Sequence, residues 1–130
     1  MSYVGIVLIS HSADLVKGLA ALLKQIQADV PLAIAGGTAE EEIGTDVFKI
    51  KSAIESVYSE KGVAIIFDLG SALLNAEMAL EMLDESWHIK IADAPLVEGA
   101  YAAIVESGVG GDLAEVITAA EGAKGLNKLG

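Results

Sequence analysis

The chain has 130 residues, of which 53% are hydrophobic and 21% are charged. This length and composition suit one folded domain with its own core. The formal net charge of -11 opposes binding to phosphate backbones and anionic lipids, so we expect no nucleic-acid partner and no membrane partner. The sequence has no cysteine, which excludes disulfide scaffolds, thiolate catalysis and cysteine-ligated zinc sites.

The apolar segments give no sign of export or membrane insertion. Residues 1–10 are mostly apolar, but they lack the basic flank and the cleavage site of a signal peptide. Elsewhere Asp, Glu and Lys interrupt every apolar run well before the roughly 20 residues that a bilayer requires. We therefore expect a cytoplasmic protein.

Short apolar runs alternate with segments of helical periodicity along the chain. The runs predict strands at Tyr3–Ile9, Leu32–Ala35, Val63–Phe67 and His88–Ile91. Helices are predicted at Ala13–Ala28 with a Ser12 cap, from a Thr45 cap to about Ser59, at Ala72–Leu83, from Pro95 onward, and from an Asp112 cap onward. The first helix should turn an apolar face inward, made of Val16, Leu19, Leu22, Leu23 and Ile26.

This alternation predicts one doubly wound α/β domain over residues 1–130. Its sheet should be mainly parallel, with four to five strands and helices on both faces. In such sheets, ligands bind beyond the carboxyl ends of the strands, where the following helices begin. The residues expected to bind there are Ser10, Ser12, Gly37, Thr38, Gly70 and Pro95.

Two titratable side chains follow predicted strands at this rim, namely His11 and Asp68. If the two strands are neighbours, a carboxylate at Asp68 can hold one ring nitrogen of His11 and leave the other free as a nucleophile. Ser71 adds a hydroxyl that can contact an anion. The set suits phosphoryl transfer, although a loop histidine can equally be solvated and Asp68 can equally be an ordinary turn residue.

Other α/β functions fit this rim less well. The chain has no Gly-x-Gly-x-x-Gly turn after the first strand, no P-loop and no Gly-x-Ser-x-Gly elbow. A response-regulator receiver would use Asp68 as phosphoacceptor, but it also needs acidic residues where His11 stands. His88 is interpreted as a packing or surface residue, and Glu40–Glu42 as a solvated segment. We predict no metal site.

Four segments together resemble the DhaM family of phosphocarriers, which serve the dihydroxyacetone kinases that depend on the sugar phosphotransferase system. The segments are Ile9–Ser12, Ile43–Asp46, Asp68–Glu77 and Ala94–Ala100. The resemblance spans the chain in register, and its wider relatives are the mannose-type enzyme IIA domains. It implies a cytoplasmic homodimer with phosphorylated His11, orienting Asp68 and a phosphoryl contact at Ser71.

The resemblance also implies the partners. HPr, charged by enzyme I from phosphoenolpyruvate, would phosphorylate His11, and His11 would then phosphorylate ADP held with magnesium on DhaL. The ATP formed would phosphorylate dihydroxyacetone on DhaK, so this chain would bind no cofactor of its own. Because the chain ends at Gly130, we expect the donor on another chain. Two alternatives stay open: a mannose-type enzyme IIA serving a sugar-transport enzyme IIB, and a catalytically inactive regulatory module.

Overall fold

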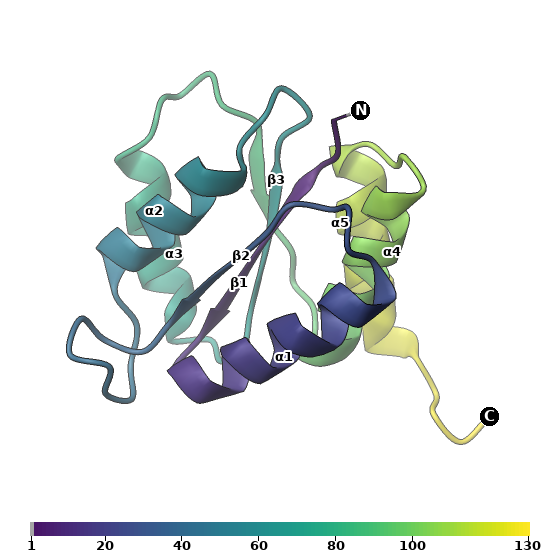
Figure 1. The fold of residues 1–130 in the computed structure, drawn as a ribbon, viewed down its shortest axis with the longest axis horizontal. Helices are drawn as coiled ribbons and strands as arrows, with labels where there is room; N and C mark the ends of the chain where they lie inside the picture. Colours follow the sequence, from purple (N-terminus) through teal and green to yellow (C-terminus); the bar gives the residue numbers. More distant parts are fainter. Residues whose placement is uncertain (1) are drawn as a thin grey trace.

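A four-stranded parallel sheet forms the centre of the computed structural model, which describes residues 2–130 (Figure 1). The strands lie in the order β2-β1-β3-β4, and every neighbouring pair is parallel. Their bounds are Gly5–Ser10 for β1, Leu32–Gly36 for β2, Val63–Phe67 for β3 and Ile89–Ile91 for β4. The predicted α/β fold is confirmed, with four strands in the sheet.

Helices cover both faces of the sheet (Figure 1). Their bounds are Ala13–Ile26 for α1, Val47–Val57 for α2, Ala72–Glu81 for α3, Leu96–Gly108 for α4 and Leu113–Gly122 for α5, followed by a short 3-10 helix, η1, at Ala123–Gly125. Helices α1, α4 and α5 pack on one face, and α2 and α3 pack on the other. None of the helices within residues 2–130 is long and apolar enough to cross a bilayer.

The central strand β1 shows why both faces must be covered. Successive side chains of a strand point to opposite faces. Accordingly Ile6 and Leu8 pack with α1, α4 and α5, while Val7 and Ile9 pack with α2 and α3. All four side chains are fully buried, so an unbroken apolar run is required here instead of an alternating one.

The element ends agree with the predicted ends to within two residues, and two of the predicted caps are confirmed. Ser12 caps α1 by accepting a hydrogen bond from the Leu15 N–H, and Asp112 caps α5. The predicted Thr45 cap is wrong, because the next residue, Asp46, accepts the hydrogen bond from the Lys49 N–H at 2.8 Å. Both residue types are good caps, and a one-residue choice between them depends on where the chain enters the helix.

The predicted inward face of α1 is correct in part. Val16, Leu19 and Leu23 are buried as expected, but Leu22 is 53% exposed and Ile26 is 42% exposed. The reason is that α1 packs beside β2, which is an edge strand. The outer flank of its apolar stripe therefore extends past the sheet and stays in contact with solvent.

Candidate active site

The loops after β1 and β3 lie side by side because these strands are neighbours in the sheet. Ile9 pairs with Phe67 in the parallel register, and the Asp68 N–H donates to the Ile9 carbonyl at 3.1 Å. His11 and Asp68 follow the two strands directly. The predicted convergence of these side chains at the carboxyl end of the sheet is confirmed by a direct hydrogen bond between them.

The Asp68 carboxylate accepts four hydrogen bonds. Its Oδ1 accepts from the His11 ring nitrogen Nδ1 at 2.9 Å and from the Leu69 N–H at 2.7 Å. Its Oδ2 accepts from the His11 N–H and from the Ser10 hydroxyl, both at 2.9 Å. The carboxylate is thus held at both oxygens, and its side chain is only 14% exposed.

The charge of Asp68 fixes the state of the histidine ring. Burial raises the pKa of Asp68, but the hydrogen bonds from His11, Ser10 and Leu69 together hold that pKa below its ordinary value of 3.8. An ionised carboxylate can only accept hydrogen bonds, so Nδ1 of the neutral ring must carry the proton. The other ring nitrogen, Nε2, then carries the lone pair.

Nε2 faces the open side of the rim. It lies 2.7 Å from the Ser71 hydroxyl, and the lone pair on Nε2 makes that hydroxyl the donor. Ser71 precedes the first residue of α3, yet its side chain makes no capping hydrogen bond. The hydroxyl of this exposed serine is therefore available to His11.

The turn into α3 presents backbone donors beside Ser71. Within the part of the chain that the structure describes, the N–H groups of Gly70 and Ser71 donate to no protein acceptor, and both residues are exposed. Free amides at a helix start favour an anion. The arrangement can hold a phosphoryl group beside Nε2 in a chain that has no arginine.

The loop between β2 and α2, residues 37–46, also borders the site. Gly37 has a φ of +76°, a backbone conformation that favours glycine. Thr38 closes the loop on itself, because its N–H donates to the Glu42 carbonyl and its hydroxyl accepts from the Glu42 N–H. The loop reaches His11 through the Gly44 N–H, which donates to the His11 carbonyl at 2.9 Å.

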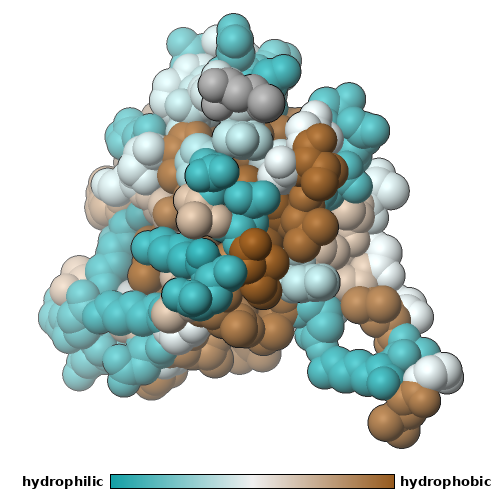
Figure 2. Space-filling model, turned by 45° about the vertical axis from the view of Figure 1, so that its right-hand side comes forward, coloured by the Kyte–Doolittle hydropathy of each residue, from teal (hydrophilic) through white to brown (hydrophobic). Residues whose placement is uncertain are grey.

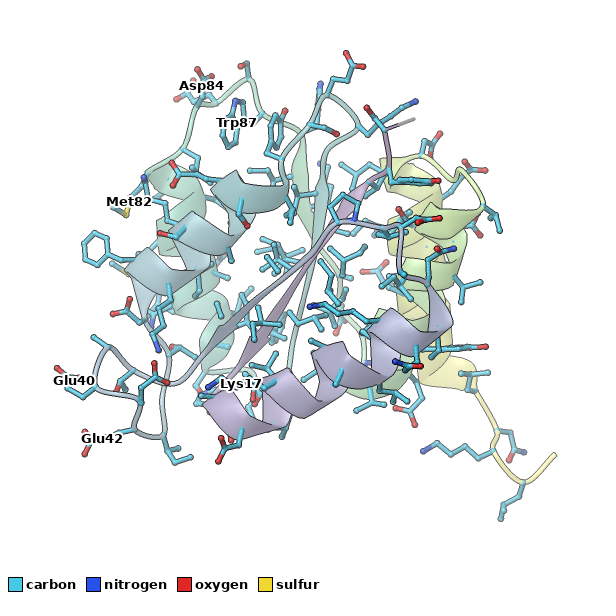
Figure 3. All side chains as sticks on the ribbon, in the orientation of Figure 1. Lys17, Glu40, Glu42, Met82, Asp84 and Trp87 are labelled. Carbon is cyan, nitrogen blue, oxygen red and sulfur yellow. The ribbon has the colours of Figure 1, made fainter. Side chains whose placement is uncertain are left out.

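A lysine ties this acidic loop to the sheet. The Lys49 ammonium donates to the Gly36 carbonyl and to the Glu41 carboxylate, both at 3.0 Å. Figure 3 shows Glu40 and Glu42 pointing outward from the loop, at the same end of the molecule as Lys17. The loop after β2 therefore presents exposed carboxylates, with Lys17 and Lys49 beside them.

The predicted site residues other than His11 and Asp68 lie in four places. Ser71 and Gly70 lie at the open side of His11, and Ser10 lies buried beneath it. Ser12, Gly37 and Thr38 belong to the adjoining helix start and loop. Pro95 lies apart from them at the start of α4, in a shallow depression that it shares with Glu98, Ala123, Lys124, Leu126 and Lys128.

Two hydrogen bonds at the site could not be predicted from the sequence. The Leu69 N–H is a donor to Asp68, and backbone donors leave no mark in a sequence. Asn75 of α3 donates to the Thr45 hydroxyl at 2.6 Å. This hydrogen bond joins α3 to the loop that precedes α2. A single amide side chain in a mostly apolar helix is the only signal of that contact.

A groove of about 550 Å³ lies elsewhere, over β2 between α1 and α2. Its lining includes Lys17, Phe48 and Lys49 but neither His11 nor Asp68. The histidine site is consequently part of the open rim and lies outside this groove.

A histidine fixed by a carboxylate on the rim of a parallel sheet suits a protein that carries a phosphoryl group, and the comparisons agree. The chain matches the family model described as PTS system fructose IIA component (EIIA-man) over residues 5–117, and it belongs to that family. Within the family it is a member of the DhaM group, as the following relatives show. The predicted resemblance is thereby confirmed.

The chain is 41% identical over 120 residues to the "PEP-dependent dihydroxyacetone kinase, phosphoryl donor subunit DhaM" of Escherichia coli K12, covering 88% of this chain and 25% of that protein. It is 43% identical over 98 residues to the phosphoryl donor subunit DhaM of dihydroxyacetone kinase 1 from Listeria innocua, covering 75% of this chain and 77% of the relative. The chain thus spans about a quarter of the Escherichia coli relative but most of the Listeria one.

A solved structure supports the same fold. The crystal structure of EF1359, a protein of unknown function, matches with a TM-score of 0.83 and 35% sequence identity, covering 98% of this chain and all of the other.

Proposed function

We propose that this chain is a phosphohistidine carrier that takes a phosphoryl group from HPr onto Nε2 of His11 and passes it to ADP bound on DhaL. The observation that carries the proposal is that the two ring nitrogens of His11 have different partners. Nδ1 is bonded to the Asp68 carboxylate, and Nε2 lies open toward Ser71. The names of the DhaM relatives, which are phosphoryl donor subunits of PEP-dependent dihydroxyacetone kinases, support a role in phosphoryl transfer.

In the first step, the Nε2 lone pair attacks phosphorus, and the bond between phosphorus and the donor breaks. The ring then carries phosphorus on Nε2 and a proton on Nδ1, so it gains positive charge. The Asp68 carboxylate, 2.9 Å from Nδ1, stabilises that charge and keeps the ring in place. The Ser71 hydroxyl and the amides of Gly70 and Ser71 hold the phosphoryl oxygens.

In the second step, an oxygen of the ADP β-phosphate attacks phosphorus, and His11 leaves as a neutral imidazole with its Nδ1 proton retained. The chain has no P-loop, and its 550 Å³ groove is not lined by His11. The nucleotide and its magnesium are therefore supplied by DhaL, and the ATP so formed phosphorylates dihydroxyacetone on DhaK. No cofactor is required on this chain, which we place in the cytoplasm.

We also propose that the carrier is a homodimer. Helices α1 and α4 present exposed apolar side chains to solvent, including Leu22, Ile26, Tyr101 and Val105. Figure 2, which brings the side of α4 and α5 forward, shows apolar surface on this face. Surface of this kind on neighbouring helices favours association.

The acceptor is tested by transfer. Protein labelled with phosphoenolpyruvate, enzyme I and HPr is mixed with DhaL loaded with magnesium and ADP. We expect the label to leave His11 and appear as ATP on DhaL within a catalytic cycle, while free ADP accepts poorly because the site has no nucleotide pocket.

The alternatives give different outcomes in this experiment. Rapid transfer to a mannose-class enzyme IIB, with none to DhaL, would identify a sugar-transport carrier. No label on the protein at all would identify an inactive regulatory module. Either result would contradict the proposed acceptor.

A further inference from the structure

Ser10 is the last residue of β1, and it is fully buried. Prediction from the sequence places it among the hydroxyls that bind the phosphoryl group. Its position beneath His11 prevents contact with a group on Nε2, which faces the other way toward Ser71. Its buried hydroxyl therefore serves another purpose.

The two hydrogen bonds of the Ser10 hydroxyl fix the direction of its proton. The Ser12 N–H donates to the Ser10 oxygen at 3.0 Å, which uses the oxygen as an acceptor. The Asp68 oxygen Oδ2 lies 2.9 Å away on the other side, and an ionised carboxylate cannot donate. The hydroxyl proton consequently points at Asp68.

A chain of oriented hydrogen bonds thus reaches Nδ1 of the His11 ring. The Ser12 N–H holds the Ser10 oxygen, the Ser10 proton holds Oδ2 of Asp68, and Oδ1 of Asp68 accepts the Nδ1 proton of His11. Without Ser10, Oδ2 keeps only the His11 N–H as a donor. Oδ1 still accepts from the His11 ring and from the Leu69 N–H, but the carboxylate loses one of its four hydrogen bonds and is held less firmly in the orientation that faces Nδ1.

From this arrangement we infer that Ser10 is a positioning residue for phosphoryl transfer, acting through Asp68 to keep the proton on Nδ1 and the lone pair on Nε2 of His11. The inference rests on the proposed phosphohistidine function for its kinetic consequence. Its consequence for the ring proton is independent of that function.

The inference is tested with Ser10→Ala, Ser10→Cys and Ser10→Thr. Alanine and cysteine remove the strong donor, whereas threonine keeps a hydroxyl on the same carbon. Removing a hydrogen bond to a charged group should slow phosphorylation of His11 by HPr roughly 10- to 100-fold in the first two variants. Threonine should restore most of the rate.

The kinetic constants separate positioning from docking. Because Ser10 is fully buried, it cannot touch HPr, so we expect the KM for phosphorylated HPr to stay unchanged while kcat falls. A raised KM with an unchanged kcat would overturn the inference.

The ring proton gives a second readout, measured by 15N NMR on the unphosphorylated protein. Wild type and Ser10→Thr should show the Nδ1–H form, and Ser10→Ala should show a mixture that includes Nε2–H. A pure Nδ1–H ring in Ser10→Ala, together with a wild-type rate, would overturn the inference. If wild type takes up no label, the proposed function fails, but this spectrum still decides the role of Ser10.

Ser107 provides the matched control. It is also fully buried, and its hydroxyl donates to the Val4 carbonyl at 2.7 Å. Val4 precedes β1, whereas His11 follows the other end of that strand. Ser107→Ala should lower stability in the same way as Ser10→Ala, yet it should leave the ring proton and the transfer rate per folded molecule unchanged. Equal changes in both variants would show a general packing effect and contradict a specific role for Ser10.

Discussion

His11→Ala should take up no label from phosphoenolpyruvate in the presence of enzyme I and HPr. The side chain is on the rim and partly exposed, so its loss leaves the core intact. Within residues 2–130, no other histidine ring is held by a carboxylate. In wild type the label should be lost in mild acid and kept in alkali, because phosphorus is bound to nitrogen. Gel autoradiography after each treatment measures both results.

His88 is the matched control for this variant. It lies just before β4, at the end of the parallel sheet opposite to His11, and its side chain is exposed. Its backbone N–H donates to the Tyr58 hydroxyl, a contact that an alanine preserves. His88→Ala should therefore be labelled normally. Label that persists in His11→Ala, or that survives mild acid, would place the acceptor on another residue.

Asp68→Asn should slow transfer through His11 by roughly 10²- to 10⁴-fold, the usual cost when the partner that orients a catalytic histidine is lost. An amide is neutral, so it cannot stabilise the charge that the ring gains on phosphorylation. It can also donate to Nδ1 through its NH₂ group, which would favour the wrong tautomer. Rapid-quench kinetics of label uptake measures the effect, and a near-normal rate would contradict the assigned role of Asp68.

The same variant should change how stability depends on pH. Hydrogen bonds hold the pKa of folded Asp68 below its ordinary value of 3.8, so its stabilising contribution is fully present above that value. The contribution is lost as pH falls from 3.8 through the lower folded-state pKa. The difference in unfolding free energy between wild type and Asp68→Asn should therefore be constant near neutral pH and shrink in acid. Urea unfolding across this range measures it, and a constant difference would contradict the lowered pKa.

The fold could be predicted from the sequence where burial dictates the pattern. Val63–Phe67 is an uninterrupted apolar run, and the strand occupies the predicted residues because a strand covered on both faces requires that composition. The exposed flank of α1 could not be predicted in this way. Leu22 and Ile26 continue an apolar stripe, and nothing in the stripe itself shows that β2 is the edge of the sheet.

The meeting of His11 and Asp68 could also be predicted, because parallel strands bring their carboxyl ends to one edge. The direction of the Ser10 hydroxyl could not. That direction depends on the burial of Ser10 at the end of β1 and on the N–H of Ser12, which donates to the Ser10 oxygen. Neither can be recognised in a sequence motif of two serines around a histidine. Sequence reasoning finds which residues are near one another, while the orientation of each donor requires the structure.

The central claim is that Nε2 of His11 carries the phosphoryl group, and NMR of the phosphorylated, 15N-labelled protein tests it most directly. Coupling between phosphorus and a ring nitrogen identifies the atom that is bonded. Nδ1 is hydrogen-bonded to Asp68 at 2.9 Å, and Nε2 faces the Ser71 hydroxyl at 2.7 Å. We therefore predict coupling between phosphorus and Nε2 of His11, with a proton still on Nδ1. Coupling to Nδ1, or phosphorus on any residue other than His11, would contradict it.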